Sequence, residues 1–320
     1  MREFAFELSL CGHLEIETDA IVSRQLGAGV RNPGTRVVDT VIVEPGSAFD
    51  ARAAITRDAI PMGAIDSDVG PGRFRQASQA IDGPAERVDR IVEQAVEIGF
   101  FERERRNGRE YIRQVTRYPH WFDRIVGIEN KPDLGRPGNL ETQLRTDVSL
   151  GVLDAVVLAT ESYVTGAHRN RVPEPVGIWW FDPETGEREV LREPKLLDPH
   201  EKGVELRERR PGRADVAIVP ATEKETARTR IAERAYGKGW RTYSFPACDR
   251  IDPDDLARPF CPWKGRIVDP ATECSPECGG YLHRDPPTVD VDAARADRQP
   301  WDPAPDGLAR RQSGLDLFTG

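Results

Sequence analysis

The pattern of apolar and polar positions predicts an alternation of helices and strands. Apolar residues recur at helical spacing over residues 3–26, and Gly27-Ala28-Gly29 then ends the predicted helix. Residues 36–44 are mostly β-branched and apolar and stop at Pro45-Gly46, which predicts a strand with Asp39 inside it. A second apolar strand, residues 125–131, ends in the polar triplet Glu129-Asn130-Lys131.

The pattern over residues 139–192 predicts one further helix and three further strands of the sheet. A helix is expected over residues 139–152, and strands over residues 155–160 and 176–181. Residues 187–192 return from a turn as the second arm of a hairpin. Strand, helix, strand and hairpin describe a mixed sheet with helices on its faces, so the fold class is α/β. An Arg- and Glu-rich helix is expected over residues 222–236.

Residues 51–118 have a different character and predict an inserted module. Pro84 opens a helix with an apolar face, and Gly99 ends it. Asn107-Gly108 then lies between two strand-like arms, and this dipeptide is the strongest short hairpin signal. Helix, strand, turn and strand in this order are typical of a winged-helix module with the hairpin as its wing.

Composition limits how the chain could contact nucleic acid. Its 320 residues suggest about two domains of roughly 150 residues each. The formal net charge is −9, so contact with DNA would need a local basic patch. Residues 103–117 carry six arginines against two glutamates, a local net charge of +4. The predicted DNA-binding residues on this hairpin are Arg103, Arg105, Arg106, Arg109 and Arg113. A solvated hairpin and a protein-contact module are the alternatives.

Asp39, Glu129 and Lys131 are the candidate catalytic residues. Side chains alternate along a strand, so Glu129 and Lys131 lie on one face. Two carboxylates from neighbouring strands suit Mg²⁺, and a nearby lysine can position the attacking water. Only one other lysine follows an acid by two positions, in Glu193-Pro194-Lys195. Its proline argues against a central strand, so Glu129-Asn130-Lys131 is the better candidate.

These elements resemble the PD-(D/E)XK, or restriction-endonuclease-like, nucleases, including RecB-like members. The resemblance is carried by the opening helix with Glu7, Val37-Val38-Asp39, Ile128-Glu129-Asn130-Lys131 and a following helix with Gln143. It implies that Asp39 and Glu129 bind Mg²⁺ and that Lys131 assists the water. It also implies that Gln143 orients the substrate or Lys131 and that Glu7 is an accessory ligand.

The resemblance also suggests a domain organisation. Asp39 and Glu129 are 90 residues apart, an interval longer than usual for such nucleases, and the winged-helix-like insertion accounts for the extra length. We therefore expect a discontinuous nuclease-like core of residues 1–50 and 119–200, an insertion of residues 51–118, a helical and cysteine-rich region of residues 201–284, and a disordered tail of residues 285–320. The whole chain is also similar to an uncharacterised family of haloarchaeal proteins.

Four of the five cysteines lie close together in the sequence. Cys248, Cys261, Cys274 and Cys278 are separated by gaps of 12, 12 and 3 residues. Four thiolates suit Zn²⁺ or an iron–sulfur cluster, and His283 is a candidate further ligand. Some RecB-like nucleases join an N-terminal cysteine and three C-terminal ones to a [4Fe–4S] cluster, so Cys11 gives a second possibility. Ordinary reduced cysteines are the third.

The sequence thus predicts a Mg²⁺-dependent nuclease that hydrolyses DNA phosphodiester bonds, in DNA repair or defence. The alternative is a catalytically inactive protein of the same fold that binds DNA or regulates through the winged helix. Arg145 and Asp147 share the predicted Gln143 helix and are expected to form solvated ion pairs. No signal-peptide pattern or membrane-spanning run occurs, so we expect a cytoplasmic protein without a membrane partner.

Overall fold

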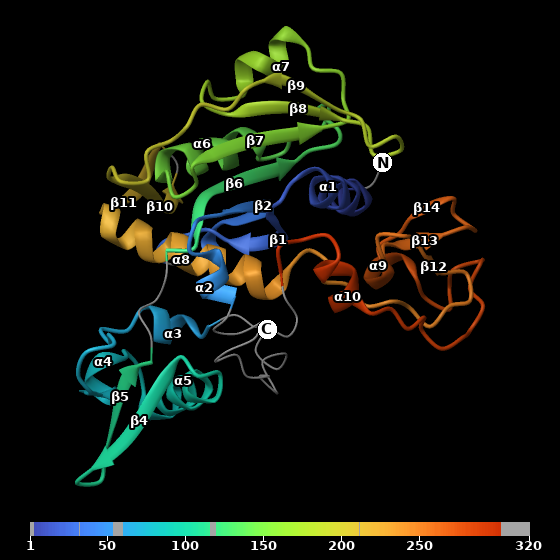
Figure 1. Cartoon of the computed structure of the whole chain (residues 1–320). Coiled ribbons are helices and arrows are strands. Elements are labelled where there is room, and N and C mark those ends of the chain that lie inside the picture. Colours follow the sequence, from blue (N-terminus) through green and yellow to red (C-terminus); the bar gives the residue numbers. More distant parts are fainter. Residues whose placement is uncertain (1–2, 32, 54–59, 116–119, 211, 302–320) are drawn as a thin grey trace.

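The computed structural model describes residues 3–31, 33–53, 60–115, 120–210 and 212–301. A six-stranded mixed sheet forms the centre (Figure 1). Neighbouring strands β6, β7 and β8 are parallel, and the other pairs are antiparallel. In spatial order the strands are β1 (Ile21–Gly27), β2 (Val37–Pro45), β6 (Phe122–Asn130), β7 (Ala155–Thr160), β8 (Gly177–Phe181) and β9 (Arg188–Arg192). The predicted α/β fold is confirmed.

Helices cover both faces of this sheet because its apolar strands alternate their side chains. Val41 and Val43 pack in one core with α6 (Leu140–Leu150) and α8 (Ala221–Lys238). Ile42 packs in a second core with α1 (Glu3–Glu17), on the opposite face. Helix α6 connects β6 to the parallel strand β7, as the sequence predicted.

The helix expected over residues 3–26 is wrong in its second half. Helix α1 ends at Glu17, where Thr18 donates from both its backbone N and its Oγ1 to the carbonyl of Leu14, at 3.1 and 2.7 Å. Ile21 and Val22 then begin β1 and pair with Val43 and Ile42 of β2. Ile21 packs in one core and Val22 in the other. Burial on both faces of the sheet favours a strand here, although the apolar residues have helical spacing.

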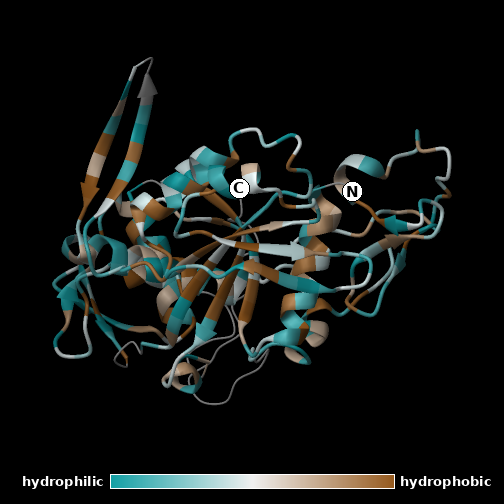
Figure 2. Cartoon of the chain, turned by 90° about the horizontal axis from the view of Figure 1, so that it is seen from above, coloured by the Kyte–Doolittle hydropathy of each residue, from teal (hydrophilic) through white to brown (hydrophobic). Residues whose placement is uncertain are grey.

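The insertion has a hydrophobic core of its own, formed by residues between Ile60 and Ile112. Its three-stranded sheet has the order β3–β5–β4, and the β4–β5 hairpin turns at Asn107 and Gly108 with φ of 51° and 75°. This hairpin extends away from the rest of the molecule (Figure 2). The elements are α2 (Phe49–Ala53), α3 (Met62–Ile65), β3 (Arg75–Gln76), α4 (Ala77–Ala80), α5 (Ala85–Glu97), β4 (Phe101–Arg106) and β5 (Arg109–Gln114).

A buried polar cluster joins the start of this insertion to the central fold. Glu233 of α8 accepts a hydrogen bond from Arg52 Nε at 2.8 Å and another from Trp121 Nε1 at 2.6 Å. All three side chains are almost completely buried. This cluster therefore holds α2 and the residue before β6, where the insertion begins and ends, against α8.

Short elements complete the chain. The sequence did not predict the hairpin of β10 and β11, whose strands alternate charged and apolar residues. The remaining elements are η1 (Pro33–Thr35), α7 (Gly166–Arg171), β10 (Gly203–Arg210), β11 (Arg213–Val219), β12 (Asp252–Pro253), β13 (Pro259–Cys261), β14 (Arg266–Ile267), α9 (Pro270–Glu273) and α10 (Val291–Ala296). No helix among the described residues has both the length and the apolar character needed to cross a membrane.

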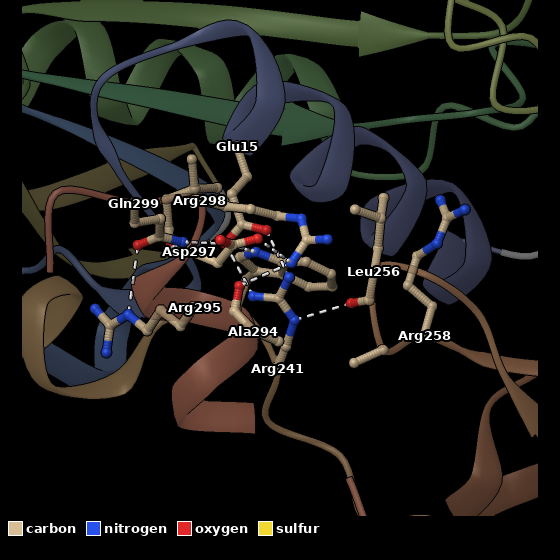
Figure 3. Close-up of polar contacts among 12 residues, drawn as sticks. Glu15, Arg241, Leu256, Arg258, Ala294, Arg295, Asp297, Arg298 and Gln299 are labelled. Carbon is tan, nitrogen blue, oxygen red and sulfur yellow. Dashed lines mark hydrogen bonds and ion pairs between the residues drawn. The ribbon is translucent and has the colours of Figure 1, made fainter. Parts of the chain in front are cut away.

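The tail predicted to be disordered from residue 285 is ordered for part of its length. Glu15 of α1 accepts hydrogen bonds at 2.8 Å from Arg241 and at 2.6 Å from Gln299, which follows α10 (Figure 3). Trp301 is buried in the main core. This prediction was wrong for residues 285–301, because a few buried side chains fix a segment of low overall hydrophobicity. Residues 302–320 lie outside the described residues.

Candidate active site

Asp39 and Glu129 lie on adjacent antiparallel strands at the same level of the sheet. Thr40 of β2 pairs with Ile128 of β6, and the register continued by one residue sets Asp39 opposite Glu129. The backbone N of Asn130 donates to Asp39 Oδ2 at 2.9 Å, which fixes the Asp39 side chain beside the end of β6. The two carboxylates that the sequence selected are therefore neighbours.

Glu7 of α1 reaches the same place through Gln25, a residue that sequence reasoning missed. Gln25 Nε2 donates to Glu7 Oε1 at 3.0 Å and to Asp39 Oδ1 at 3.4 Å. Gln25 has a φ of 52°, an uncommon left-handed conformation for a residue other than glycine. Glu7 also forms an ion pair with Arg24 at 2.9 Å. Gln25 thus joins the candidate accessory ligand to Asp39.

Both central carboxyls hold their protons more tightly than usual. Burial raises the pKa of Asp39 to about 6, with the charges of Glu7 and Glu3 adding to the rise. Burial raises the pKa of Glu129 to about 7, and the neighbouring Asp39 carboxylate adds to it. Since like charges at close range resist joint ionisation, a cation between them would favour the doubly charged state.

Arg36 already supplies one positive charge to this site. Its guanidinium donates to Glu129 Oε2 at 2.6 Å and to both carboxylate oxygens of Asp147, at 2.7 and 2.6 Å. Asp147 is 2% exposed, so the prediction of a solvated ion pair for it was wrong. Its position three residues after the buried Leu144 was the signal available in the sequence. Arg145 pairs with Glu141 at the surface, as predicted.

Lys131 and Gln143 form no hydrogen bond or ion pair with Asp39 or Glu129 among the described residues. Lys131 follows β6, and its ammonium lies 3.6 Å from Glu3 Oε1 at the start of α1. Gln143 is one helical turn before Asp147 on the same face of α6. Within the described parts of the chain, no hydrogen bond joins the Gln143 side chain to Lys131 or to either central carboxylate. The structure thus brings together Asp39, Glu129 and Glu7, whereas no hydrogen bond or ion pair among the described residues joins Lys131 or Gln143 to them.

Metal binding here would rest on few protein ligands. Across the described ranges, no group of three or more His, Cys, Asp or Glu side chains is arranged to hold a metal ion. Asp39 and Glu129 could supply two oxygen ligands. Mg²⁺ commonly binds in this way, through one or two carboxylates, with water or phosphate oxygens completing an octahedron.

The two strands of the arginine-rich hairpin have a smaller net charge than the longer segment 103–117. Residues 101–114 contain five arginines and three glutamates, a net charge of +2. Arg103, Arg106 and Arg113 form ion pairs with Glu110, Glu104 and Glu102, respectively. Arg105 and Arg109 flank the turn and are exposed, and neither has an ion pair among the described residues. The sixth arginine, Arg117, lies outside the described residues.

The cysteines separate into two places. Cys11 packs in the core beneath α1, with its sulfur 3.6 Å from Thr40 Oγ1. Cys248, Cys261 and Cys274 share a different small core near the C-terminal end of the chain. The prediction that joined Cys11 to the C-terminal cysteines was therefore wrong, because Cys11 faces the sheet.

Together these features define an α/β protein with an acidic pair, buried Glu129 and partly buried Asp39, at one end of two central strands. The model of one protein family, Family of unknown function (DUF5787), matches residues 21–283. The chain belongs to this family. No significant match was found among curated proteins, nor among solved structures.

Proposed function

We propose that this protein is a Mg²⁺-dependent nuclease that hydrolyses DNA phosphodiester bonds. The observation that carries the proposal is the pairing of Asp39 with Glu129 across β2 and β6, with Lys131 two residues further along. Two neighbouring carboxylates whose pKa values burial raises mark a candidate functional site.

Each residue has a distinct role in this proposal. Asp39 and Glu129 bind Mg²⁺, which would neutralise charge on the scissile phosphate and lower the pKa of a bound water. Gln25 holds Asp39 in place through its amide and links it to Glu7. Lys131 orients the attacking water or a phosphate oxygen once its ammonium leaves the exposed Glu3. Gln143 contacts the substrate from α6.

The order of the elements supports this proposal as well. Helix α1, strands β2 and β6, and helix α6 follow one another as in the nuclease resemblance drawn from the sequence. The insertion enters between β2 and β6, the two strands that carry the acids. The insertion leaves β2 at Pro45 and rejoins the sheet at Phe122, so it lies at the opposite end of these strands from Asp39 and Glu129. In this proposal Arg105 and Arg109 contact phosphates at a distance from the bond to be cut.

A specific observation favours the second candidate, a catalytically inactive DNA-binding protein of the same fold. Arg36 already neutralises Glu129 at 2.6 Å and is itself held by Asp147. If this pairing is permanent, the positive charge of Arg36 replaces that of the metal. Such a protein would bind DNA equally well in EDTA and would leave it uncut.

Plasmid nicking distinguishes the two candidates. Supercoiled DNA is incubated with the full-length protein in Mg²⁺ or EDTA, beside the Asp39→Asn and Lys131→Ala variants. The nuclease proposal predicts nicking by the wild type in Mg²⁺ alone, with a loss of at least 100-fold in both variants (about 3 kcal/mol of transition-state stabilisation). Arg145→Ala, at the surface of α6, is the matched control and should retain activity. Equal nicking by all proteins would indicate contamination and refute the proposal.

A further inference from the structure

Residues 245–284, here called the cysteine module, have a very small core. Its strands β12, β13 and β14 are two or three residues long. Three of the seven side chains that form its core are cysteines: the buried members are Cys248, Ile251, Cys261 and Val268, and the partly buried ones are Phe245, Cys274 and Tyr281. A segment of this size generally needs a metal or disulfides in addition to its apolar contacts.

Three of the four cysteines begin tight turns of the backbone. The carbonyls of Cys248, Cys261 and Cys278 each accept a hydrogen bond from the backbone N of the residue three positions later, at 3.1, 3.0 and 2.9 Å. Each of these cysteines therefore begins a tight turn. Cys274 follows directly after α9, whose N-terminus is capped by Asp269.

Three of the four cysteines already share one small core. Cys248 and Cys261 are buried there and Cys274 is partly buried, and Cys278 follows Cys274 by four residues. Lys264 lies on the turn that Cys261 begins. A cation at the centre would remove the repulsion among the thiolates, and Lys264 would offset the remaining negative charge.

We propose that Cys248, Cys261, Cys274 and Cys278 bind one Zn²⁺ ion, which holds the cysteine module together. Each thiol would lose its proton to solvent on binding, and four thiolates complete the tetrahedral shell of a closed structural site. Cys248, Cys261 and Cys274 contribute to this core, but among the described residues no group of three or more side chains is already arranged to hold a metal ion. Zinc binding therefore requires rotation of the thiols toward a common centre.

His283 is not needed as a ligand in this proposal. Its backbone pairs with Cys248 in an isolated β-bridge, which joins the two ends of the module. Its ring Nδ1 lies 3.2 Å from the hydroxyl of Tyr281 and has a hydrogen-bond partner there. The four sulfurs are sufficient for a tetrahedral site.

The cysteine module supports α1, which carries Glu7. A Cβ atom on Gly12 of α1 would lie 2.7 Å from the Leu256 side chain, so this side chain packs directly against the α1 backbone. Arg241, just before the module, donates to both Glu15 of α1 and the Leu256 carbonyl (Figure 3). Loss of zinc is therefore expected to loosen the packing of α1 while leaving the sheet intact.

Metal analysis of the full-length protein tests this proposal independently of any nuclease activity. We expect about one zinc per chain after purification in chelator-free buffer, and replacement by Co²⁺ should give the intense visible bands of tetrahedral thiolate coordination. Cys261→Ser and Cys274→Ser should lose most of the bound zinc. Cys11→Ser, which changes a buried cysteine outside the module, should retain it.

Two results would overturn the proposal. One is protein without bound zinc that also fails to take up Zn²⁺ or Co²⁺ while its four module thiols react with a thiol reagent in the folded state. The other is bound iron with inorganic sulfide in place of zinc. If a serine variant does not fold, chelator treatment of the wild type followed by Co²⁺ titration gives the same decision without a substitution.

Discussion

The guanidinium of Arg36 donates to the carboxylate of Glu129 at 2.6 Å, so one of the two proposed metal ligands already has a cationic partner. Arg36 is buried and also pairs with Asp147. A divalent cation at this site must therefore share Glu129 with Arg36. The same ion pair therefore stabilises the fold and limits how Glu129 could bind a metal ion.

Removal of Arg36 should be strongly destabilising. Arg36→Met leaves Glu129 and Asp147 buried without a counter-ion, and breaking a buried pair costs about 3–5 kcal/mol of unfolding free energy. Urea denaturation measures the change. The control is Arg31→Met, since Arg31 pairs with Glu223 at the surface and its loss should change stability little. Equal losses in the two variants would contradict the role assigned to Arg36.

The raised pKa of Asp39 predicts that this residue reduces stability at neutral pH. Its pKa is about 6 in the folded protein, above the ordinary value of about 3.9 for an unfolded chain. Between these values the folded state binds more protons, so stability falls as the pH rises. In EDTA, Asp39→Asn should exceed the wild type by about 1–2 kcal/mol at pH 8 and by almost nothing at pH 4. Asp123→Asn, an exposed position on β6, should change stability equally little at both pH values.

Magnesium should stabilise the folded protein, and more so at higher pH. Both Asp39 and Glu129 must be deprotonated to bind the ion, and their pKa values of about 6 and 7 make binding weak below pH 6. We expect Mg²⁺ to raise Tm at pH 8, to raise it less at pH 6, and not to raise it in Asp39→Asn. Glu141→Gln, on the exposed face of α6, should respond as the wild type does. A shift that persists in Asp39→Asn would place the ion elsewhere.

The tip of the β4–β5 hairpin should contribute to DNA binding through charge alone. Arg105→Glu combined with Arg109→Glu should weaken binding to any duplex by tenfold or more and reduce the slope of log K against log salt by about 2. Arg213→Glu makes the same type of change on a different exposed hairpin and serves as the control. Fluorescence anisotropy at several salt concentrations measures both quantities. Unchanged affinity would support a protein-contact role for the hairpin.

The strongest local patterns in the sequence predicted the corresponding elements correctly. The β-branched run before Pro45 became β2, and Asn107-Gly108 became a hairpin turn. The run before Lys131 became β6. Because Asp39 and Glu129 belong to these two strands, the centre of the candidate site could be predicted before its geometry was known.

Long-range contacts between polar residues could not be predicted in this way. Arg36 and Asp147 are 111 positions apart, and a single sequence gives no indication that they meet. Gln25 enters the site through a left-handed backbone conformation inside β1, a strand the sequence did not predict. In β10 and β11 many charged residues occur among the apolar ones, so the alternation of apolar and polar positions that marks a strand is weak. These elements depend on tertiary packing more than on local preference.

Cleavage of supercoiled DNA by the wild type and by Asp39→Asn tests the central claim most directly, because it requires the acidic pair and the metal together. We predict Mg²⁺-dependent nicking by the wild type that EDTA abolishes, and at least 100-fold slower nicking by Asp39→Asn, whose fold should be intact and more stable in EDTA. Wild-type protein that binds DNA but never nicks it, in Mg²⁺ or Mn²⁺ between pH 6 and 9, would contradict the account and favour the inactive DNA-binding protein.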